Sequence, residues 1–313
     1  MKSEEKKLVS IGHLTKDDIV FSTGKTSFNS LGGACLYSAG GAAIFGGNPT
    51  IISVVGNSYN YEALTDIAQY ANIDITRVKR INEHGIDIWV LYDNRGQHYF
   101  IPKYYSGAFD EVVPTCEMIT DDLLNKMNFF HVTPMPINVQ RDIVRYLVEK
   151  NCLVTLDPPM VSRQDTSFAE WASMLQQLEV FFPSEIEFES LGGRLGNSLE
   201  SEITEFSNYY GVKTLVLKVA EKGAYLYLRE KEELYHIHTA CKNVLDCTGA
   251  GDAFAGGFLY KYMCHSDPVE SLKYATVAAA VAVESATVID FVHKGKSQVE
   301  ARLVQAPEVK RLL

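Results

Sequence analysis

Residues 246–258 read DCTGAGDAFAGGF, and the interpretation of the whole chain starts from this stretch. Three small residues, Gly249, Ala250 and Gly251, lead into a segment that predicts a helix running to about Met263. Glycine lets the backbone turn sharply and approach a ligand closely. The first amides of a helix lack an intrahelical partner and carry the positive end of its dipole. The segment therefore predicts a binding site for an anion.

Asp252 falls in the first turn of this predicted helix, where a carboxylate stays ionised. Beside an anion site, a carboxylate suits the role of a general base that takes a proton from a hydroxyl attacking phosphorus. The residues alone leave a structural interpretation equally open. In that interpretation Asp252 is an ordinary N-terminal helix carboxylate, and Gly256 and Gly257 allow close helix packing.

Composition indicates a globular protein that acts on a small molecule. The chain has 313 residues, of which 46% are hydrophobic, and a formal net charge of −10. This charge disfavours binding to nucleic acid or to an anionic membrane surface. The longest apolar run, about residues 275–283, falls far short of the ~20 residues that a bilayer requires. The charged start MKSEEKK and six cysteines without a CxxC pair predict a reduced, cytoplasmic protein.

Short apolar runs alternate with helical patterns along the chain. Alternation of this kind predicts an α/β fold, a mostly parallel sheet with helices on both faces. In such sheets ligands bind at the carboxyl ends of the strands. The predicted strands are residues 8–11, 50–55, 129–132, 153–156, 180–182 and 214–219. The predicted helices are residues 61–71, 139–150, 168–178, 201–210 and 268–284.

Two stretches, residues 18–31 and 86–105, alternate apolar and polar residues and predict antiparallel strands outside the main sheet. Residues 93–96, with the sequence DNRG, predict a hairpin turn. A small sheet built from two insertions would cover a ligand cleft as a lid, although an ordinary edge hairpin is the alternative. Because no linker-like segment divides the chain, we predict one domain over residues 1–313.

The DCTGAGD stretch resembles the D-T-x-G-A-G-D signature of the ribokinase/PfkB family of carbohydrate kinases, from which only Cys247 departs. Other segments resemble the family's landmarks in the right order across nearly the whole chain. These are Gly12 with Asp17, the pair Gly32-Gly33, the triplet Val55-Gly56-Asn57, the step Asp157-Pro158, the segment Ser184 to Glu187, and Lys218 to Gly223.

The resemblance implies a Rossmann-like sheet with a small β lid and transfer of the ATP γ-phosphoryl group to a hydroxyl, with Mg²⁺ as cofactor. It makes Asp252 the base and the amides of Gly249, Ala250 and Gly251 the phosphate site. The implied acceptor-binding residues are Asp17, Gly32, Gly33, Tyr37 and Asn57. The implied nucleotide-binding residues are Ser184, Glu187, Lys218, Glu221, Gly223, Gly249 and Gly251. Glu187 would organise Mg²⁺ through water, and Asp246 is a candidate ligand for a monovalent cation such as K⁺.

Three departures bear on this assignment. Tyr37 stands where the family has an asparagine that bonds the sugar, and a phenol offers one hydroxyl in place of the two-sided hydrogen bonding of an amide. Ribose or fructose in the usual pose is therefore in doubt. Ser184 replaces the asparagine of the N-x-x-E element and weakens the magnesium argument, while Ala220 replaces a loop glycine.

The sequence leaves three functions open. The first is an ATP-dependent kinase for a sugar or polyol. The second is a nucleoside or hydroxymethylpyrimidine kinase of the same fold, in which aromatic residues either stack on a base or only pack: Tyr37, Trp89, Tyr92 and Tyr99. The third, from another class, is a non-catalytic sugar-binding regulatory relative, which we expect to have lost the base. The resemblance also suggests a homodimer through the lid.

Overall fold

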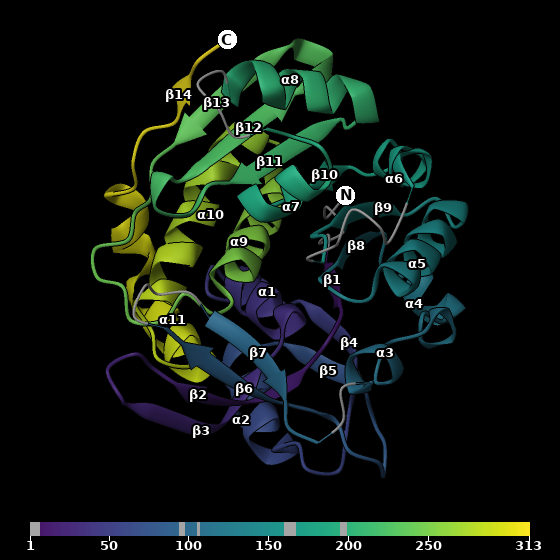
Figure 1. Cartoon of the computed structure of the whole chain (residues 1–313), viewed down its shortest axis with the longest axis vertical. Coiled ribbons are helices and arrows are strands. Elements are labelled where there is room, and N and C mark those ends of the chain that lie inside the picture. The colour runs from purple at the N-terminus through teal and green to yellow at the C-terminus, as the bar shows by residue number, and fades with distance from the viewer. Residues whose placement is uncertain (1–6, 94–97, 105–106, 160–166, 195–198) are drawn as a thin grey trace, which may run out of the picture.

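The computed structural model describes residues 7–93, 98–104, 107–159, 167–194 and 199–313. Within these ranges the chain forms one ten-stranded sheet and one four-stranded sheet (Figure 1). The strand order of the large sheet is β14-β13-β12-β11-β10-β9-β8-β1-β4-β5. None of the helices in these ranges is long and apolar enough to span a bilayer.

The middle of the large sheet is parallel, as the sequence predicts. Its strands are nearly continuous apolar runs because helices cover both of their faces. The six predicted strands are all present, as β1 (Leu8–Ile11), β4 (Thr50–Val55), β8 (Phe129–Val132), β9 (Leu153–Leu156), β10 (Val180–Phe181) and β11 (Thr214–Lys218).

Four strands of the large sheet lie outside this prediction. They are β5 (Asp74–Arg80), β12 (Ala224–Leu228), β13 (Glu233–Ile237) and β14 (Lys310–Arg311). The last three add to β11 as an antiparallel extension, so the sheet is parallel only in part.

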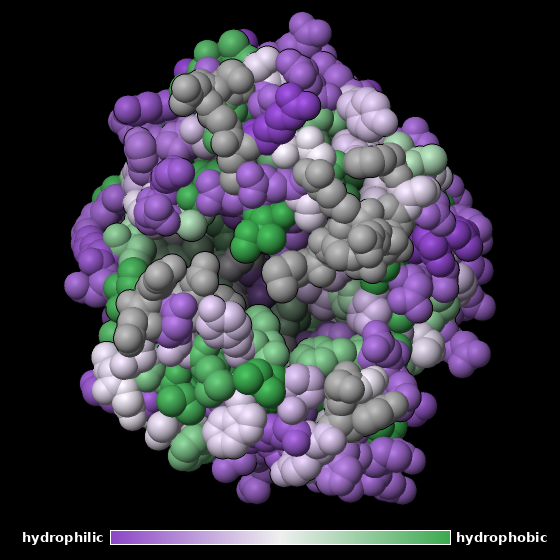
Figure 2. Space-filling view, in the orientation of Figure 1, coloured by the Kyte–Doolittle hydropathy of each residue, from purple (hydrophilic) through white to green (hydrophobic). Residues whose placement is uncertain are grey.

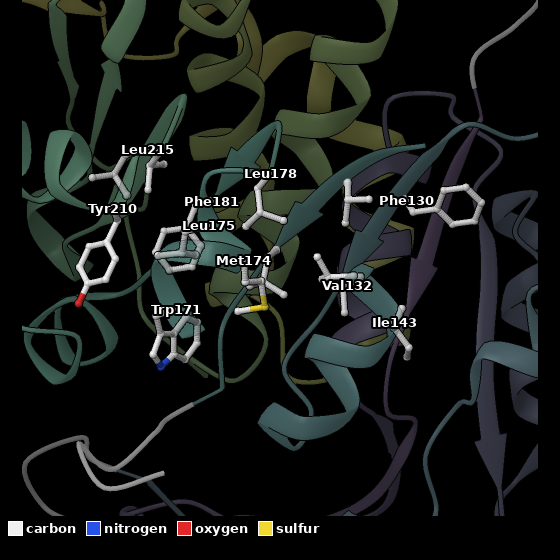
Figure 3. Packing of buried hydrophobic residues seen from close by; sticks show 14 of the residues in the cluster. Phe130, Val132, Ile143, Trp171, Met174, Leu175, Leu178, Phe181, Tyr210 and Leu215 are labelled. Carbon is white, nitrogen blue, oxygen red and sulfur yellow. The ribbon is translucent and has the colours of Figure 1, made fainter. Parts of the chain in front are cut away.

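Helices cover both faces of the large sheet, which confirms the predicted layering. On one face lies a cluster that includes Phe130, Trp171 and Phe181 (Figure 3). It is covered by α5 (Ile137–Glu149), α6 (Phe168–Leu175) and α8 (Leu199–Tyr210). The other face carries α1 (Ala34–Ala43), α2 (Tyr61–Ala71), α9 (Ala250–His265), α10 (Pro268–Val283) and α11 (Val288–Val304).

Short helices complete the connections between the main elements. They are α3 (Ala108–Glu111), η1 (Cys116–Met118), α4 (Asp121–Leu124), α7 (Glu185–Ser190), η2 (Ala220–Lys222) and η3 (Arg229–Lys231).

The small sheet has the strand order β3-β2-β6-β7 and is built from the two predicted insertions. Each insertion is an antiparallel hairpin, but β2 and β6 pair in parallel, so the prediction of antiparallel strands is wrong at this junction. The predicted turn at 93–96 lies largely outside the described residues. The strands are β2 (Thr15–Val20), β3 (Thr26–Gly32), β6 (Ile86–Tyr92) and β7 (His98–Pro102).

Register divides the side chains of the small sheet between two faces. Asp17 is paired with Ile88, and successive side chains of a strand alternate, so Val90 and Tyr92 share the face of Asp17. That inner face buries Ile88 and Val90 against Val54 of the large sheet and Ala108 of α3. The opposite, outer face carries Trp89, whose ring lies under the Lys103 ammonium.

Candidate active site

The N-terminus of α9 forms the turn that the sequence predicts. Gly249 caps the helix with a φ of +72°, and a Cβ at this position would overlap the ring of Tyr37. Only glycine satisfies both requirements. The amide of Ala250 donates to the Cys247 carbonyl over 3.3 Å, whereas those of Gly249 and Gly251 donate to no backbone carbonyl of the described residues. Gly249 and Gly251 are therefore the amides best placed to bind an anion.

Lys218 brings a positive charge to this turn. A Cβ built on Gly251 would lie 3.3 Å from the Lys218 Nζ. The ammonium donates to Asp157 Oδ2 over 2.6 Å, and both side chains are largely buried. Burial opposes the charge on Lys218, but the carboxylates of Asp157 and Glu187 outweigh it and raise the lysine's pKa. Burial also raises the pKa of Asp157, and the Lys218 ammonium opposes that rise.

Asp252 lies beside the same ammonium. Burial raises the pKa of Asp252 to about 6, an effect that Lys218 counteracts and Glu187 reinforces. A carboxyl group with this pKa is mainly ionised at pH 7 and is still basic enough to accept a proton from a substrate.

Ser184 and Glu187 form a capping box at the start of α7. The Ser184 amide donates to Glu187 Oε2 over 2.5 Å, and the Glu187 amide donates to Ser184 Oγ over 3.5 Å. Serine and asparagine are both good N-cap residues. Ser184 therefore preserves the local structure that an asparagine would give, and Glu187 keeps its place near Lys218.

A second group of predicted residues lies on the inner face of the small sheet. Asp17 is buried, and its Oδ1 has no hydrogen-bond partner among the described residues. Gly32 packs so closely against the Asp17 carboxyl that a Cβ would overlap it, and Gly33 caps α1. Burial raises the pKa of Asp17 to about 7, Thr15 lowers it, and Asp246 raises it further. A buried carboxyl oxygen without a partner is suited to accept a hydrogen bond from a ligand hydroxyl.

Tyr37 and Asp246 lie between these two groups. The ring of Tyr37 is buried against Gly249 and stacks on Phe291 at a centroid distance of 6.1 Å. Burial and the charge of Asp246 hold the pKa of Tyr37 well above its ordinary value, so the phenol stays neutral. Asp246 is also buried, and its Oδ2 has no partner among the residues described.

Other predicted residues lie at the margins of this site. The Asn57 side chain donates from Nδ2 to the Asn82 carbonyl over 2.6 Å, which commits part of its hydrogen-bonding capacity. Glu221 is exposed on η2, and Gly223 ends that turn with a φ of +100°. Trp89 and Tyr99 lie on the outer face of the small sheet, where a ligand held by Asp17 does not reach them. Stacking of these two on such a ligand is therefore wrong, and among the lid aromatics Trp89, Tyr92 and Tyr99 only Tyr92 shares the inner face.

The surface is hollowed near its centre, between the small sheet and the body that carries the large sheet (Figure 2). Within the described ranges, no three His, Cys, Asp or Glu side chains gather closely enough to hold a metal ion by themselves. A metal bound here would need further ligands from a substrate, which is typical of Mg²⁺ bound with a nucleotide.

Residues 5–294 match the family described as pfkB family carbohydrate kinase. The chain belongs to this family. The match confirms the resemblance that the sequence motifs indicate, and it covers both the small sheet and the α9 turn.

Curated relatives of this pfkB chain differ in their acceptors. The chain is 26% identical over 259 residues to a cytidine kinase of Thermococcus kodakarensis, covering 82% of this chain and 88% of the relative. It is also 26% identical over 252 residues to an ATP-dependent 6-phosphofructokinase of Thermoanaerobacterium thermosaccharolyticum, covering 77% and 74%. These similarities support a phosphotransferase without identifying the acceptor.

A solved structure confirms the fold. It is that of a candidate ribokinase II from E. coli in complex with ATP and Mg²⁺, with a TM-score of 0.76 at 19% identity, covering 95% of this chain and 99% of that one. The predicted ribokinase-like architecture, a mostly parallel sheet with helices and a small accessory sheet, is therefore present.

Two residues of the site make contacts that the sequence-based assignment does not include. Asp157 follows β9 directly, and its place at the carboxyl end of a parallel strand is the signal that could have marked it. Tyr92 donates to Asp246 and shares a hydrogen bond with Thr248. No local pattern indicates this contact, because the partners are 154 residues apart.

The loop after β11 allows a stability test. Ala220 has a φ of +48°, in the left-handed region that costs a non-glycine residue roughly 1–2 kcal/mol. Glycine relieves this strain, but it also increases the conformational entropy of the unfolded chain, which offsets part of the gain. We therefore expect Ala220→Gly to raise the free energy of unfolding by about 0.5–1 kcal/mol in urea denaturation. Ala224→Gly in the buried strand β12 is the control and should lower it; equal losses in both variants would contradict strain at Ala220.

Proposed function

We propose that the chain transfers the γ-phosphoryl group of ATP to a hydroxyl of a sugar or polyol, with Asp252 as general base. The observation that carries this proposal is the juxtaposition of Asp252, the amides of Gly249 and Gly251, and the Lys218 ammonium. Phosphoryl transfer depends mainly on positioning and on charge compensation, and these groups supply both.

In the proposed reaction, Asp17 accepts a hydrogen bond from the acceptor and orients it. Asp252 takes the proton of the reacting hydroxyl as its oxygen forms a bond to the γ-phosphorus. The bond between that phosphorus and the β–γ bridging oxygen breaks, and ADP leaves with the electron pair. The amides of Gly249 and Gly251 and the Lys218 ammonium stabilise the negative charge on the transferring group. The small sheet excludes water, which would otherwise accept the phosphoryl group.

ATP and Mg²⁺ are the proposed cofactors, and the structural relative solved with both supports them. Glu187 is the candidate for organising Mg²⁺ through water, and its carboxylate suits a hard cation that also binds substrate phosphates. When bound, the metal would compensate phosphate charge. The nucleotide would lie along residues drawn from α7, β11 and η2, namely Ser184, Glu187, Lys218, Glu221 and Gly223.

We also propose that Asp246 binds a monovalent cation. Its Oδ1 accepts hydrogen bonds, whereas the buried Oδ2 has no partner among the described residues. An anionic oxygen in this situation suits a K⁺ ion, which would add positive charge behind the α9 turn.

A nucleoside acceptor is the second candidate, and the cytidine kinase relative is the observation that favours it. A nucleoside presents a sugar hydroxyl to Asp17 and Asp252 just as a free sugar does. A hydroxymethylpyrimidine would present a comparable hydroxyl. The non-catalytic regulatory alternative is disfavoured, because we expect such a relative to have lost the base, and Asp252 is present.

We also propose that the small sheet mediates a homodimer. Its outer face exposes apolar side chains: Tyr99 is 52% exposed, Ile101 is 44% exposed, and Phe28, which packs edge-on against Trp89, is 55% exposed. A contiguous apolar face of this kind marks an interaction surface. A second copy would cover it while leaving the inner face free for the acceptor.

The acceptor class is tested by a panel of sugars, polyols, nucleosides and hydroxymethylpyrimidines with Mg-ATP, read by release of ADP. We expect turnover with at least one sugar or polyol, and phosphorylated product by mass spectrometry. Turnover with cytidine or inosine alone would replace the first proposal by the second. ADP release at background level with every acceptor would contradict a kinase function.

Asp252 is tested by Asp252→Asn, which keeps the shape of the side chain and removes the base. We expect kcat to fall by about 10²–10⁴-fold, with the affinity for ATP nearly unchanged. In the wild type only the ionised carboxylate accepts a proton, so kcat/KM should rise with pH and level off above about 6. A wild-type profile flat between pH 5 and 7, or a variant with full turnover, would remove Asp252 from the mechanism.

The dimer is tested by Ile101→Lys, which places a charge on the outer face. We expect the wild type to sediment as a dimer and the variant as a monomer in analytical ultracentrifugation. Ile186→Lys is the matched control, because Ile186 is 61% exposed on α7, outside the small sheet. A wild type that stays monomeric at about 100 μM, where a dimer with a Kd of about 1 μM would be largely formed, would contradict this interface.

A further inference from the structure

Tyr92 connects the small sheet to the loop that precedes the α9 turn. It is the last residue of β6, on the inner face, and its ring stacks on Phe21 at a centroid distance of 5.7 Å. Its hydroxyl donates to Asp246 Oδ1 and lies 2.7 Å from Thr248 Oγ1. The hydroxyl thus joins a strand of the accessory sheet to the segment that begins the phosphate-binding motif.

Several hydrogen bonds fix the position of Asp246. Its Oδ1 also accepts from the Thr248 amide over 2.8 Å, and its own amide donates to the Val283 carbonyl over 3.1 Å. The Tyr92 hydroxyl donates its proton to the Asp246 carboxylate. Hydrogen bonds to a charged acceptor are about twice as strong as neutral ones. The small sheet therefore contributes a strong restraint to a loop that ends, one residue after Thr248, in Gly249.

We propose that Tyr92 is a positioning residue for phosphoryl transfer, whose hydroxyl holds the 246–249 loop so that the amides of Gly249 and Gly251 face the transferring phosphate. This inference rests on the proposed function, and it adds a role for the small sheet beyond covering the site. By thermodynamic linkage, this restraint between the small sheet and the loop acts in both directions. A small sheet in place orders the anion turn, and an ordered turn retains the small sheet.

The variant Tyr92→Phe removes the hydroxyl and keeps the stacked ring. It tests the restraint on the 246–249 loop by a measurement that does not depend on catalysis. Tyr99→Phe is the matched control, since Tyr99 is a half-exposed tyrosine on the outer face of the same sheet. We expect hydrogen–deuterium exchange across residues 246–252 to become about tenfold faster in Tyr92→Phe. Tyr99→Phe should match the wild type. Unchanged exchange in Tyr92→Phe would overturn the proposal.

Kinetics with an acceptor from the panel separate positioning from binding. We expect Tyr92→Phe to lower kcat by about tenfold or more and to change the acceptor KM by less than about threefold. A raised KM at unchanged kcat would assign Tyr92 to direct acceptor binding and overturn the proposal. In an Asp246→Ala background the same substitution should have little further effect, because the acceptor of the Tyr92 hydroxyl is already removed. A full additional tenfold loss in that background would also overturn it.

The exchange experiment and the kinase assay test the two proposals separately. If the wild type phosphorylates no acceptor, the kinase proposal is contradicted, while the exchange experiment still measures what Tyr92 does to the loop. If Tyr92→Phe does not fold, Thr248→Val removes the other hydroxyl contact, and the same exchange result is expected from it. Unchanged exchange in that variant would then count against the proposal.

Discussion

The close packing of α1 against α9 is the constraint on which the candidate site depends. A Cβ on Gly256 of α9 would overlap the Ser38 carbonyl of α1, and a Cβ on Gly41 of α1 would overlap the Ala253 carbonyl of α9. The two backbones are therefore in direct contact, and the packing interpretation of Gly256 is confirmed. Both helices begin at the site, α1 after the glycine pair beside Asp17 and α9 at Gly249. Direct contact between the helices brings the buried carboxyl and the anion turn together.

Much of the fold could be predicted because its core strands are short, continuous apolar runs. β1, β4, β8 and β9 have the predicted bounds, since burial on both faces leaves little choice of residue. β5 reads DITRVKR and is exposed along most of its length, so it lacks that signal. The parallel pairing of β2 with β6 could not be predicted either. Each hairpin is locally encoded, but their mutual orientation is set by contacts with Val54 and Ala108 from other parts of the chain.

The candidate site also has a part that could be predicted from the sequence and a part that could not. The turn at Gly249 and the carboxylate of Asp252 are contiguous in sequence, and a helix N-terminus has known physical properties, so their arrangement follows from the sequence. Asp157 and Tyr92 reach the site from other strands, and only the folded register brings them there. Tyr37 shows a further limit. The residue type of Tyr37 predicts an altered contact with the acceptor. It does not predict that the Tyr37 ring packs against Gly249 of the α9 turn.

The charge balance of the site indicates what kind of ligand it can accept. Three carboxylates, of Asp157, Glu187 and Asp252, act on the single ammonium of Lys218. With all of them ionised, this cluster is negative, and a polyphosphate alone would be repelled. The helix N-terminus contributes only about half a positive charge. A nucleotide accompanied by a divalent cation resolves this conflict, since the cation adds the missing positive charge. The carboxylate of Glu187 also raises the pKa of Asp252, so the same charge that would repel a bare polyphosphate makes Asp252 a stronger base.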